Sequence, residues 1–146
     1  MATESDLVDL LPLIRAYCEF YGVAPSDEDL LNLARSLIAD PEHNGFQVIA
    51  RDDAGTAAGF ATVFWSWSTL AAARTSTMND LFVLPDARGS GLAEELIDDC
   101  RVRSAQGGAV SMRWQTARDN LRAQTVYNRI GASRAEWVDY SIATDK

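Results

Sequence analysis

The chain has 146 residues, a length that fits one domain with a sizeable buried core. Its composition, 47% hydrophobic and 23% charged, is that of an ordinary globular protein, and a net charge of −8 argues against binding to nucleic acids. Two cysteines and one histidine are too few for a structural zinc site, so no metal is expected. Without a long apolar run or a signal-peptide layout, we expect a cytoplasmic protein that does not enter membranes.

The first half of the chain predicts two helices. The first is marked by apolar residues at helical spacing: Leu10, Leu13, Ile14, Tyr17 and Cys18. Pro12 suits the first turn of this helix, and Gly22 ends it. Ser26 is a suitable N-cap for the second helix, which Pro41 stops.

The spacing of apolar residues then becomes that of strands. Residues 46–51 and 57–67 predict two strands joined by the turn "DDAG". After a loop of small residues, residues 77–83 predict a third strand, whose apolar end is typical of a central position. A helix over residues 92–105, a strand over 109–116, a helix over 119–130 and a last strand over 135–143 follow. Helices interleaved with strands predict a single α/β or α+β domain over residues 1–146.

The loop between the third strand and its following helix is rich in glycine, and three phosphate-binding motifs compete for it. A P-loop is excluded because Leu92 and Ala93 stand where Lys and Ser or Thr are needed. A Rossmann motif is excluded because Glu94 replaces the third glycine. The remaining pattern is Arg-x-x-Gly-x-Ala, from Arg88 through Gly91 to Ala93. It indicates either a diphosphate site on the helix N-terminus or a mere tight turn.

This pattern, in the stretch "VLPDARGSGLAEELI", resembles the acetyl-CoA-binding motif of the GNAT (GCN5-related) N-acetyltransferases. The companion motif of that family matches Asn120, Ala123, Tyr127, Gly131 and Ala132, in order and at the family's spacing. Two motifs, each in its expected strand–loop–helix setting, make the resemblance specific. The segments "CEFYG" and "MNDLFV" look most like small members that acetylate polyamines or exposed lysines.

The resemblance implies a single domain with a central mixed, mainly antiparallel sheet flanked by about four helices. The family begins with a strand before its first helix, where this chain has only "MATESD". Either that strand is missing or reduced, or Met1 is not the natural start. This departure puts the edge of the sheet in question, though not the cofactor site.

For acetyl-CoA as cosubstrate, the resemblance implies that the pantetheine arm pairs with backbone near Phe82 and Val83, as an added strand would. The diphosphate would then meet backbone N–H groups of the glycine loop: Gly89, Ser90, Gly91, Leu92 and Ala93. Arg88 either contacts a phosphate or braces the loop. Asn120 either hydrogen-bonds the arm or caps its helix, and both roles are compatible.

The resemblance also assigns Tyr127 as the acid that protonates the departing thiolate. A phenol's ordinary pKa of about 10 is close to that of a thiol, so this proton transfer is nearly balanced. The alternative is that Tyr127 packs on a buried helix face. Asp80, where many members of the family carry an acidic residue, is the candidate base, or else it anchors a neighbouring loop. Glu19 is a weaker candidate.

Aromatic residues of the first helix and the second strand offer an acceptor pocket beside Glu19, or else belong to the core: Tyr17, Phe20, Tyr21, Trp65 and Trp67. The function expected is acetyl transfer from acetyl-CoA to a small cationic primary amine, polyamine- or aminoglycoside-like. The alternatives are acetylation of a protein N-terminus or lysine, and a non-catalytic acyl-CoA-binding module. Homodimers are common in the family, so a homodimer is possible.

Overall fold

The computed structural model describes residues 1–144. The chain divides into two compact units, with the boundary between Gln115 and Thr116. The first unit contains every strand and most of the helices, and the second contains one helix. The expected single domain over residues 1–146 stays a prediction. No helix in the described part of the chain is long and apolar enough to cross a membrane.

The first unit is built on one four-stranded sheet in the order β1-β2-β3-β4. Its strands are β1 (Gly45–Arg51), β2 (Ala57–Ser68), β3 (Ala73–Val83) and β4 (Met112–Arg113). The β1–β2 and β2–β3 pairs are antiparallel, whereas β3 and β4 are parallel. The expected mixed, mainly antiparallel sheet is therefore confirmed.

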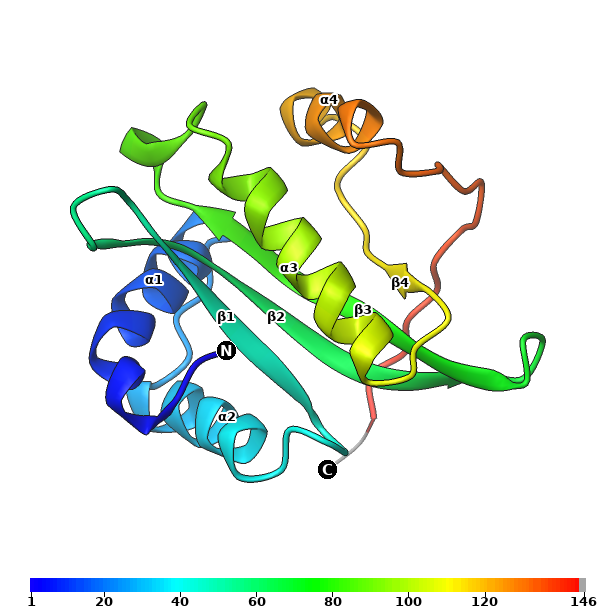
Figure 1. The fold of residues 1–146 in the computed structure, drawn as a ribbon, viewed down its shortest axis with the longest axis horizontal. Helices are drawn as coiled ribbons and strands as arrows, with labels where there is room; N and C mark the ends of the chain where they lie inside the picture. Colours follow the sequence, from blue (N-terminus) through cyan, green and yellow to red (C-terminus); the bar gives the residue numbers. More distant parts are fainter. Residues whose placement is uncertain (145–146) are drawn as a thin grey trace. The chain divides into compact units, whose positions relative to one another are not determined.

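Helices cover both faces of this sheet (Figure 1). The 3-10 turn Glu4–Asp6 leads into α1 (Leu7–Phe20), and α1 packs with α2 (Asp27–Ala39) against β2 and β1. After the 3-10 turn Pro85–Ala87, α3 (Leu92–Gln106) crosses the other face, over β1, β2 and β3. As predicted, the Ser26 hydroxyl caps α2 by accepting a hydrogen bond from the Asp29 N–H, 3.1 Å away.

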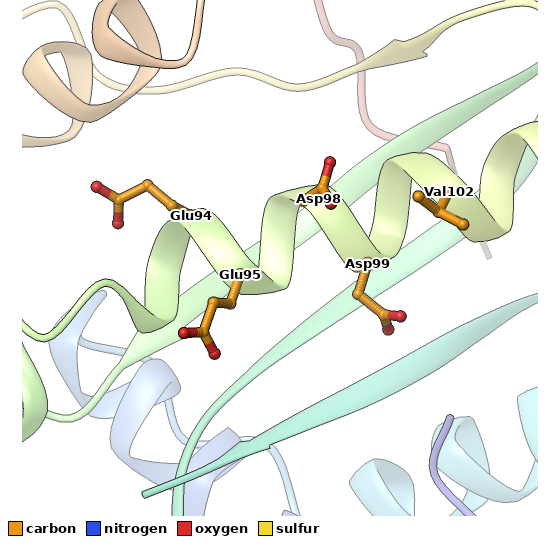
Figure 2. A pocket seen from close by; sticks show the side chains of 5 residues that line it. All are labelled: Glu94, Glu95, Asp98, Asp99 and Val102. Atoms are coloured by element: carbon orange, nitrogen blue, oxygen red, sulfur yellow. The ribbon is translucent and has the colours of Figure 1, made fainter.

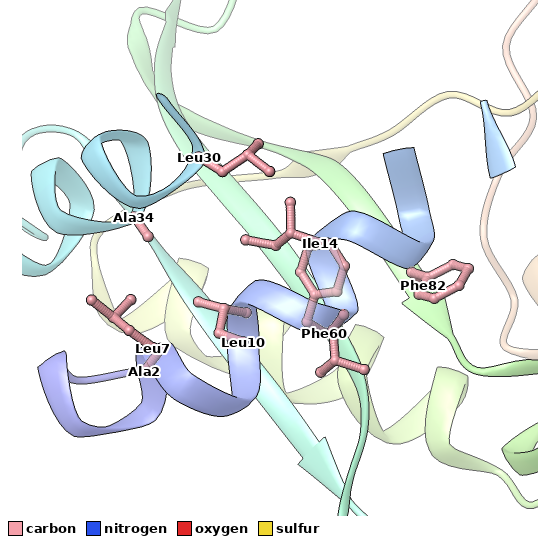
Figure 3. Close-up of a cluster of buried hydrophobic side chains, with 9 residues drawn as sticks. Ala2, Leu7, Leu10, Ile14, Leu30, Ala34, Phe60 and Phe82 are labelled. Carbon is pink, nitrogen blue, oxygen red and sulfur yellow. The ribbon is translucent and has the colours of Figure 1, made fainter. Parts of the chain in front are cut away.

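The core between α1, α2 and the sheet is apolar (Figure 3). Its buried members are Ala2, Leu7, Leu10, Leu13, Ile14, Leu30, Ala34, Phe60 and Phe82. Phe60 is 1% exposed, and its ring centroid lies 5.7 Å from that of Tyr17 and 6.4 Å from that of Phe82. Burial of such a side chain contributes about 1.5–3 kcal/mol. These contacts fix α1 over the beginning of β2 and the end of β3.

Helix α1 begins earlier than Pro12 suggested. The helix starts at Leu7, so Pro12 lies in its interior rather than in its first turn. Proline cannot donate to the carbonyl four residues before it, here that of Val8. Val8 is 77% exposed and Pro12 is exposed too, so water has access to that face of the helix. The buried face, which includes Leu7 and Leu10, holds the helix in place.

At the N-terminal end, no strand precedes α1 in the part of the chain that the structure describes. The Ala2 N–H instead donates one hydrogen bond to the Gln47 carbonyl on β1, at 2.7 Å. Ala2 itself is buried in the core. Residues 1–6 therefore form no strand, and one backbone hydrogen bond joins them to that edge of the sheet.

Two strand predictions were wrong in extent, and a third predicted strand does not form. The third strand begins at Ala73 because β3 continues the β2 hairpin through the predicted loop. The strand expected over 109–116 is reduced to Met112–Arg113, and the one expected over 135–143 does not form. Alternating apolar residues suit a strand, but a strand exists only where a partner strand pairs with it. In the second unit, helix α4 (Leu121–Arg129) matches its prediction.

Candidate active site

A β-bulge in β3 determines where Asp80 points. Thr62 pairs with Asp80 and Val63 pairs with Met78, so Asn79 is the extra residue. Since Thr62 and Val63 are consecutive and face opposite sides, Asp80 and Met78 also face opposite sides. On a regular strand the two would share one face. The bulge therefore turns Asp80 toward α1, on the side that carries Phe60 and Phe82.

Tyr17 of α1 lies over this part of β3. Its ring centroid is 5.9 Å from that of Phe82 and 5.0 Å from that of Tyr21, one helical turn later. The Tyr17 hydroxyl lies near enough to Asp80 for the carboxylate to affect its ionisation. Burial raises the pKa of Tyr17 above the ordinary phenol range, and the Asp80 carboxylate adds to that rise. At neutral pH the phenol thus stays protonated.

Two other predicted substrate residues lie apart from this group. Glu19 is exposed on α1 and, two residues from Tyr17, points away from the sheet. Trp65 of β2 packs against the C-terminal end of α3, away from Asp80. The guanidinium carbon of Arg74 lies 4.0 Å from the centroid of its ring. The Trp65 ring also packs so closely on Gly107 that a Cβ there would lie 2.4 Å away. The structure therefore brings together Tyr17, Tyr21 and Asp80, but not Glu19 or Trp65.

Within the first unit, no strand pairs with the outer edge of β3 beyond Thr77, because β4 pairs only with Ser76 and Thr77. A Cβ placed on Gly59 of β2 would lie 2.7 Å from the Phe82 carbonyl oxygen, so that carbonyl faces β2. Backbone groups of alternate residues point to opposite edges of an antiparallel strand. Leu81 and Val83 therefore present their backbone groups to the open edge. An extended, amide-bearing arm fits such an edge.

The glycine loop connects this edge to the N-terminus of α3. Gly89 and Gly91 have φ of +79° and +90°, values at which any other residue is strained. The first helical hydrogen bond of α3 runs from the Glu95 N–H to the Gly91 carbonyl. The N–H groups of Leu92 and Ala93 precede that bond and have no carbonyl of an earlier turn to meet. Together with the helix dipole, they suit a phosphate group.

Arg88 braces the loop, which was one of its two expected roles. Its Nε donates to the Val83 carbonyl at 3.0 Å, and its guanidinium carbon lies 5.9 Å from the Phe82 ring centroid. Ser90 adds a hydrogen bond from its hydroxyl to the Ala87 carbonyl at 2.5 Å. These contacts tie the loop to the end of β3. The residues present therefore fit a coenzyme A chain that runs from the β3 edge to the α3 N-terminus.

The second unit carries the other predicted site residues on α4. Asn120 caps this helix, since its Oδ1 accepts from the Ala123 N–H at 3.2 Å. Tyr127 lies in the last turn of the helix and is partly buried. The chain then turns at Gly131, with φ of +79°, and the Ala132 N–H returns to the Tyr127 carbonyl at 3.0 Å. The capping role expected of Asn120 is confirmed.

A shallow pocket runs along α3, lined by Glu94, Glu95, Asp98, Asp99 and Val102 (Figure 2). The acidic side chains diverge to two sides of the helix. Asp98 pairs with Arg101 and Asp99 with Arg103, each at 2.7 Å. This lining repels a diphosphate and belongs to no group described above. Within residues 1–144, no three His, Cys, Asp or Glu side chains gather to hold a metal ion.

Residues 10–132 match the Acetyltransferase (GNAT) family. The chain is also 30% identical over 130 residues to the Uncharacterized N-acetyltransferase YhfO of Bacillus subtilis (strain 168). That match spans 89% of this chain and 85% of the relative. The chain belongs to the GNAT acetyltransferase family. It is thus an N-acetyltransferase, of a family that takes its acetyl group from acetyl-CoA.

Solved structures support the same fold. The crystal structure of a probable acetyltransferase has 30% sequence identity and a TM-score of 0.82, covering 99% of this chain and 96% of that one. AAC(6')-Iy in complex with the bisubstrate analog CoA-S-monomethyl-acetylneamine is similar at 22% identity. Its TM-score is 0.80, with coverage of 99% of this chain and 95% of that one. At that identity, the likeness shows the fold alone.

Sequence reasoning missed the polar neighbours of Asp80. Thr62, its partner across the strands, is fully buried, and Gln47 is the next residue in the same row. The available signal was that Gln47 and Thr62 are each a polar residue between two apolar ones. The bulge at Asn79 had a weaker signal, since "TSTMNDLF" does not keep a strict alternation.

Proposed function

We propose that this protein transfers the acetyl group of acetyl-CoA to the primary amine of a small cationic molecule. The observation that carries the proposal is the course of β3. Its bulge turns Asp80 toward α1, and its open edge leads through the Gly89–Gly91 loop to the N-terminus of α3. One strand thus offers a carboxylate for an ammonium group and, a few residues later, backbone for a coenzyme A chain.

On the cofactor side, Leu81 and Val83 hold the pantetheine arm by backbone hydrogen bonds, while Phe82 faces β2. The N–H groups of the loop and of the first turn of α3 hold the diphosphate. Arg88 fixes the loop through its Nε, and the terminal nitrogens of its guanidinium contact a phosphate. Acetyl-CoA, when bound, supplies the acetyl group as an activated thioester.

On the amine side, Asp80 attracts the cation and removes one of its protons, directly or through a water molecule. The freed nitrogen forms a bond to the acetyl carbon as the bond from that carbon to sulfur breaks. Tyr127 gives its hydroxyl proton to the departing sulfur and regains a proton from solvent. The nitrogen loses its second proton to solvent as the amide forms. In all, two protons leave the nitrogen, one proton reaches the sulfur through Tyr127 and a net one is released to solvent, so atoms and charges balance.

The choice of a small cation rests on Asp80, Tyr17 and Tyr21. A carboxylate flanked by aromatic rings suits an ammonium group, because the carboxylate and the rings each attract a cation. The net charge of −8 favours a cationic substrate as well. Fold neighbours favour neither substrate class. They include an aminoglycoside acetyltransferase in complex with sisomicin and a ribosomal-protein-alanine N-acetyltransferase of Brucella melitensis. A protein N-terminus therefore stays the second candidate.

The test is the release of coenzyme A thiol from acetyl-CoA with a panel of polyamines, aminoglycosides and peptides with a free N-terminus or lysine. Wild type is compared with Tyr127→Phe. We expect turnover with a small polycation and a loss of about tenfold or more in kcat for the variant, because the acid is missing. Unchanged turnover in the variant would remove Tyr127 from the chemistry.

Asn128→Ala is the matched control. Asn128 is the exposed neighbour of Tyr127 on α4, so its truncation reports any general disturbance of that helix. We expect its kcat to stay near that of wild type. Turnover on peptides alone would replace the small-amine proposal with the protein-directed one. Binding of coenzyme A without turnover of any amine would refute both.

A further inference from the structure

The register of the sheet places three polar residues in one row across three strands. Gln47 of β1 pairs with Thr62 of β2, and Thr62 pairs with Asp80 of β3. Directly opposite residues of an antiparallel pair point to the same face, with Cβ atoms about 4.5–5.5 Å apart. The neighbouring row on this face is apolar and consists of Ile49, Phe60 and Phe82.

Gln47 and Thr62 are buried, at 4% and 0% exposure, and their side chains form a hydrogen bond with each other. The Gln47 Nε2 donates to the Thr62 Oγ1 at 3.1 Å. Since the Thr62 oxygen is the acceptor, its own proton remains for another partner. Along β2 the same-face neighbours of Thr62 are Phe60 and Phe64, which accept nothing. The row itself continues to the carboxylate of Asp80.

Stability alone gives little reason for this polar pair. The Gln47 Oε1 is buried without a hydrogen-bond partner. An unsatisfied buried acceptor costs about 1–3 kcal/mol, and an apolar pair of the same shape is often neutral or stabilising. The pair therefore lowers the stability that an apolar row would give. What it supplies instead is a buried hydroxyl on the residue that pairs with Asp80.

The other contacts of Asp80 come from different directions. The Asn79 Nδ2 donates to its Oδ1 at 3.0 Å from the bulge, and the Tyr17 hydroxyl approaches from α1. Thr62 lies on the third side, across the strand pair. A carboxylate with neighbours on three sides is restricted in orientation, as a base acting on a bound amine requires.

We propose that Thr62, itself held by Gln47, is a positioning residue that fixes the carboxylate of Asp80. The inference rests on the proposed role of Asp80 as base. Thr62 touches neither substrate nor cofactor and acts only through Asp80. Its effect therefore depends on the presence of that carboxylate.

The first experiment is a double-mutant cycle between Thr62 and Asp80. Thr62→Val keeps the side-chain shape without the hydroxyl, and Thr62→Ser keeps the hydroxyl. With the amine that turns over, we expect Thr62→Val to lower kcat about tenfold and Thr62→Ser to stay within about threefold of wild type. In an Asp80→Asn background, Thr62→Val should change the residual kcat by less than about twofold.

The second experiment needs no turnover. Crystal structures of wild type, Thr62→Val and Thr62→Ser would compare the side-chain conformation of Asp80. We expect one conformation in wild type and in the serine variant, and a rotated or split carboxylate in the valine variant. An unmoved carboxylate in Thr62→Val would overturn the inference, whatever the activity.

The outcomes separate this inference from the proposed function. If Asp80→Asn loses activity while Thr62→Val does not, the positioning role is refuted and the base is retained. The same holds if Thr62→Val lowers kcat equally in both backgrounds. If Asp80→Asn turns over at the wild-type rate, the base role is refuted and the positioning role with it.

Discussion

Replacement of Gly91 by alanine should weaken coenzyme A binding far more than it destabilises the fold. Gly91 precedes α3 with φ of +90°, and no atom lies within 4 Å of the position that a Cβ would take. The cost to the fold is therefore backbone strain without a clash, about 1–2 kcal/mol for an L-residue in this region. Alanine recovers part of this, because it also restricts the unfolded chain.

Coenzyme A binding should suffer more, because relief of the strain turns the N–H groups of Leu92 and Ala93 away from the phosphate position. Loss of one charge-assisted hydrogen bond costs about 1.5–3 kcal/mol, which raises Kd roughly 10- to 150-fold. Isothermal titration calorimetry with coenzyme A measures this without turnover. Urea unfolding of the same variant measures the strain.

Gly55→Ala provides the matched control. Gly55 lies in the turn between β1 and β2, with φ of +82° and open space around its Cβ position. Its substitution should destabilise the fold by a similar amount and leave the Kd of coenzyme A unchanged. The reasoning is refuted if Gly91→Ala binds coenzyme A as wild type does, or if Gly55→Ala weakens binding equally.

Two further predictions concern stability and the thiols. Phe60→Ala should lower the free energy of unfolding in urea by about 3–5 kcal/mol because Phe60 is fully buried, whereas Trp67→Ala, at a 75% exposed position, should change it by less than about 0.5 kcal/mol. Equal effects would contradict the described core. Burial raises the pKa of the Cys100 thiol to about 12. An unfolded thiol ionises near pH 9 while this one does not, so stability should fall above pH 9, by up to about 1.4 kcal/mol per pH unit. Cys100→Ala should remove that slope between pH 9 and 10, and in the native protein a thiol reagent should modify the partly exposed Cys18 long before Cys100.

Local signals in the sequence predicted much of the fold. The cap at Ser26, the glycines before α3 and the cap at Asn120 each depend on a few consecutive residues, and the structure has all three. The β1–β2 hairpin was predicted for the same reason, from two short strands around a turn. Such features need no knowledge of distant parts of the chain.

The failures were non-local. Residues 109–116 and 135–143 have suitable alternation, but strand formation depends on partners that no local pattern specifies. Pro12 lies in the interior of a helix because the burial of Leu7 and Leu10 outweighs the loss of one backbone hydrogen bond. The row that joins Gln47 and Thr62 to Asp80 depends on the register of three strands and on a bulge. Its composition could be predicted only once those pairings were known.

The most direct test of the central claim is the identity of the acetylated product. The protein would be incubated with acetyl-CoA and a mixture of spermidine, an aminoglycoside and a peptide with a free N-terminus and a lysine. Mass spectrometry would then find which molecule gains one acetyl group. Acetylation of a small polycation, strongly reduced by Asp80→Asn, is the predicted result. Acetylation of the peptide alone, or of nothing while coenzyme A still binds, would contradict the account.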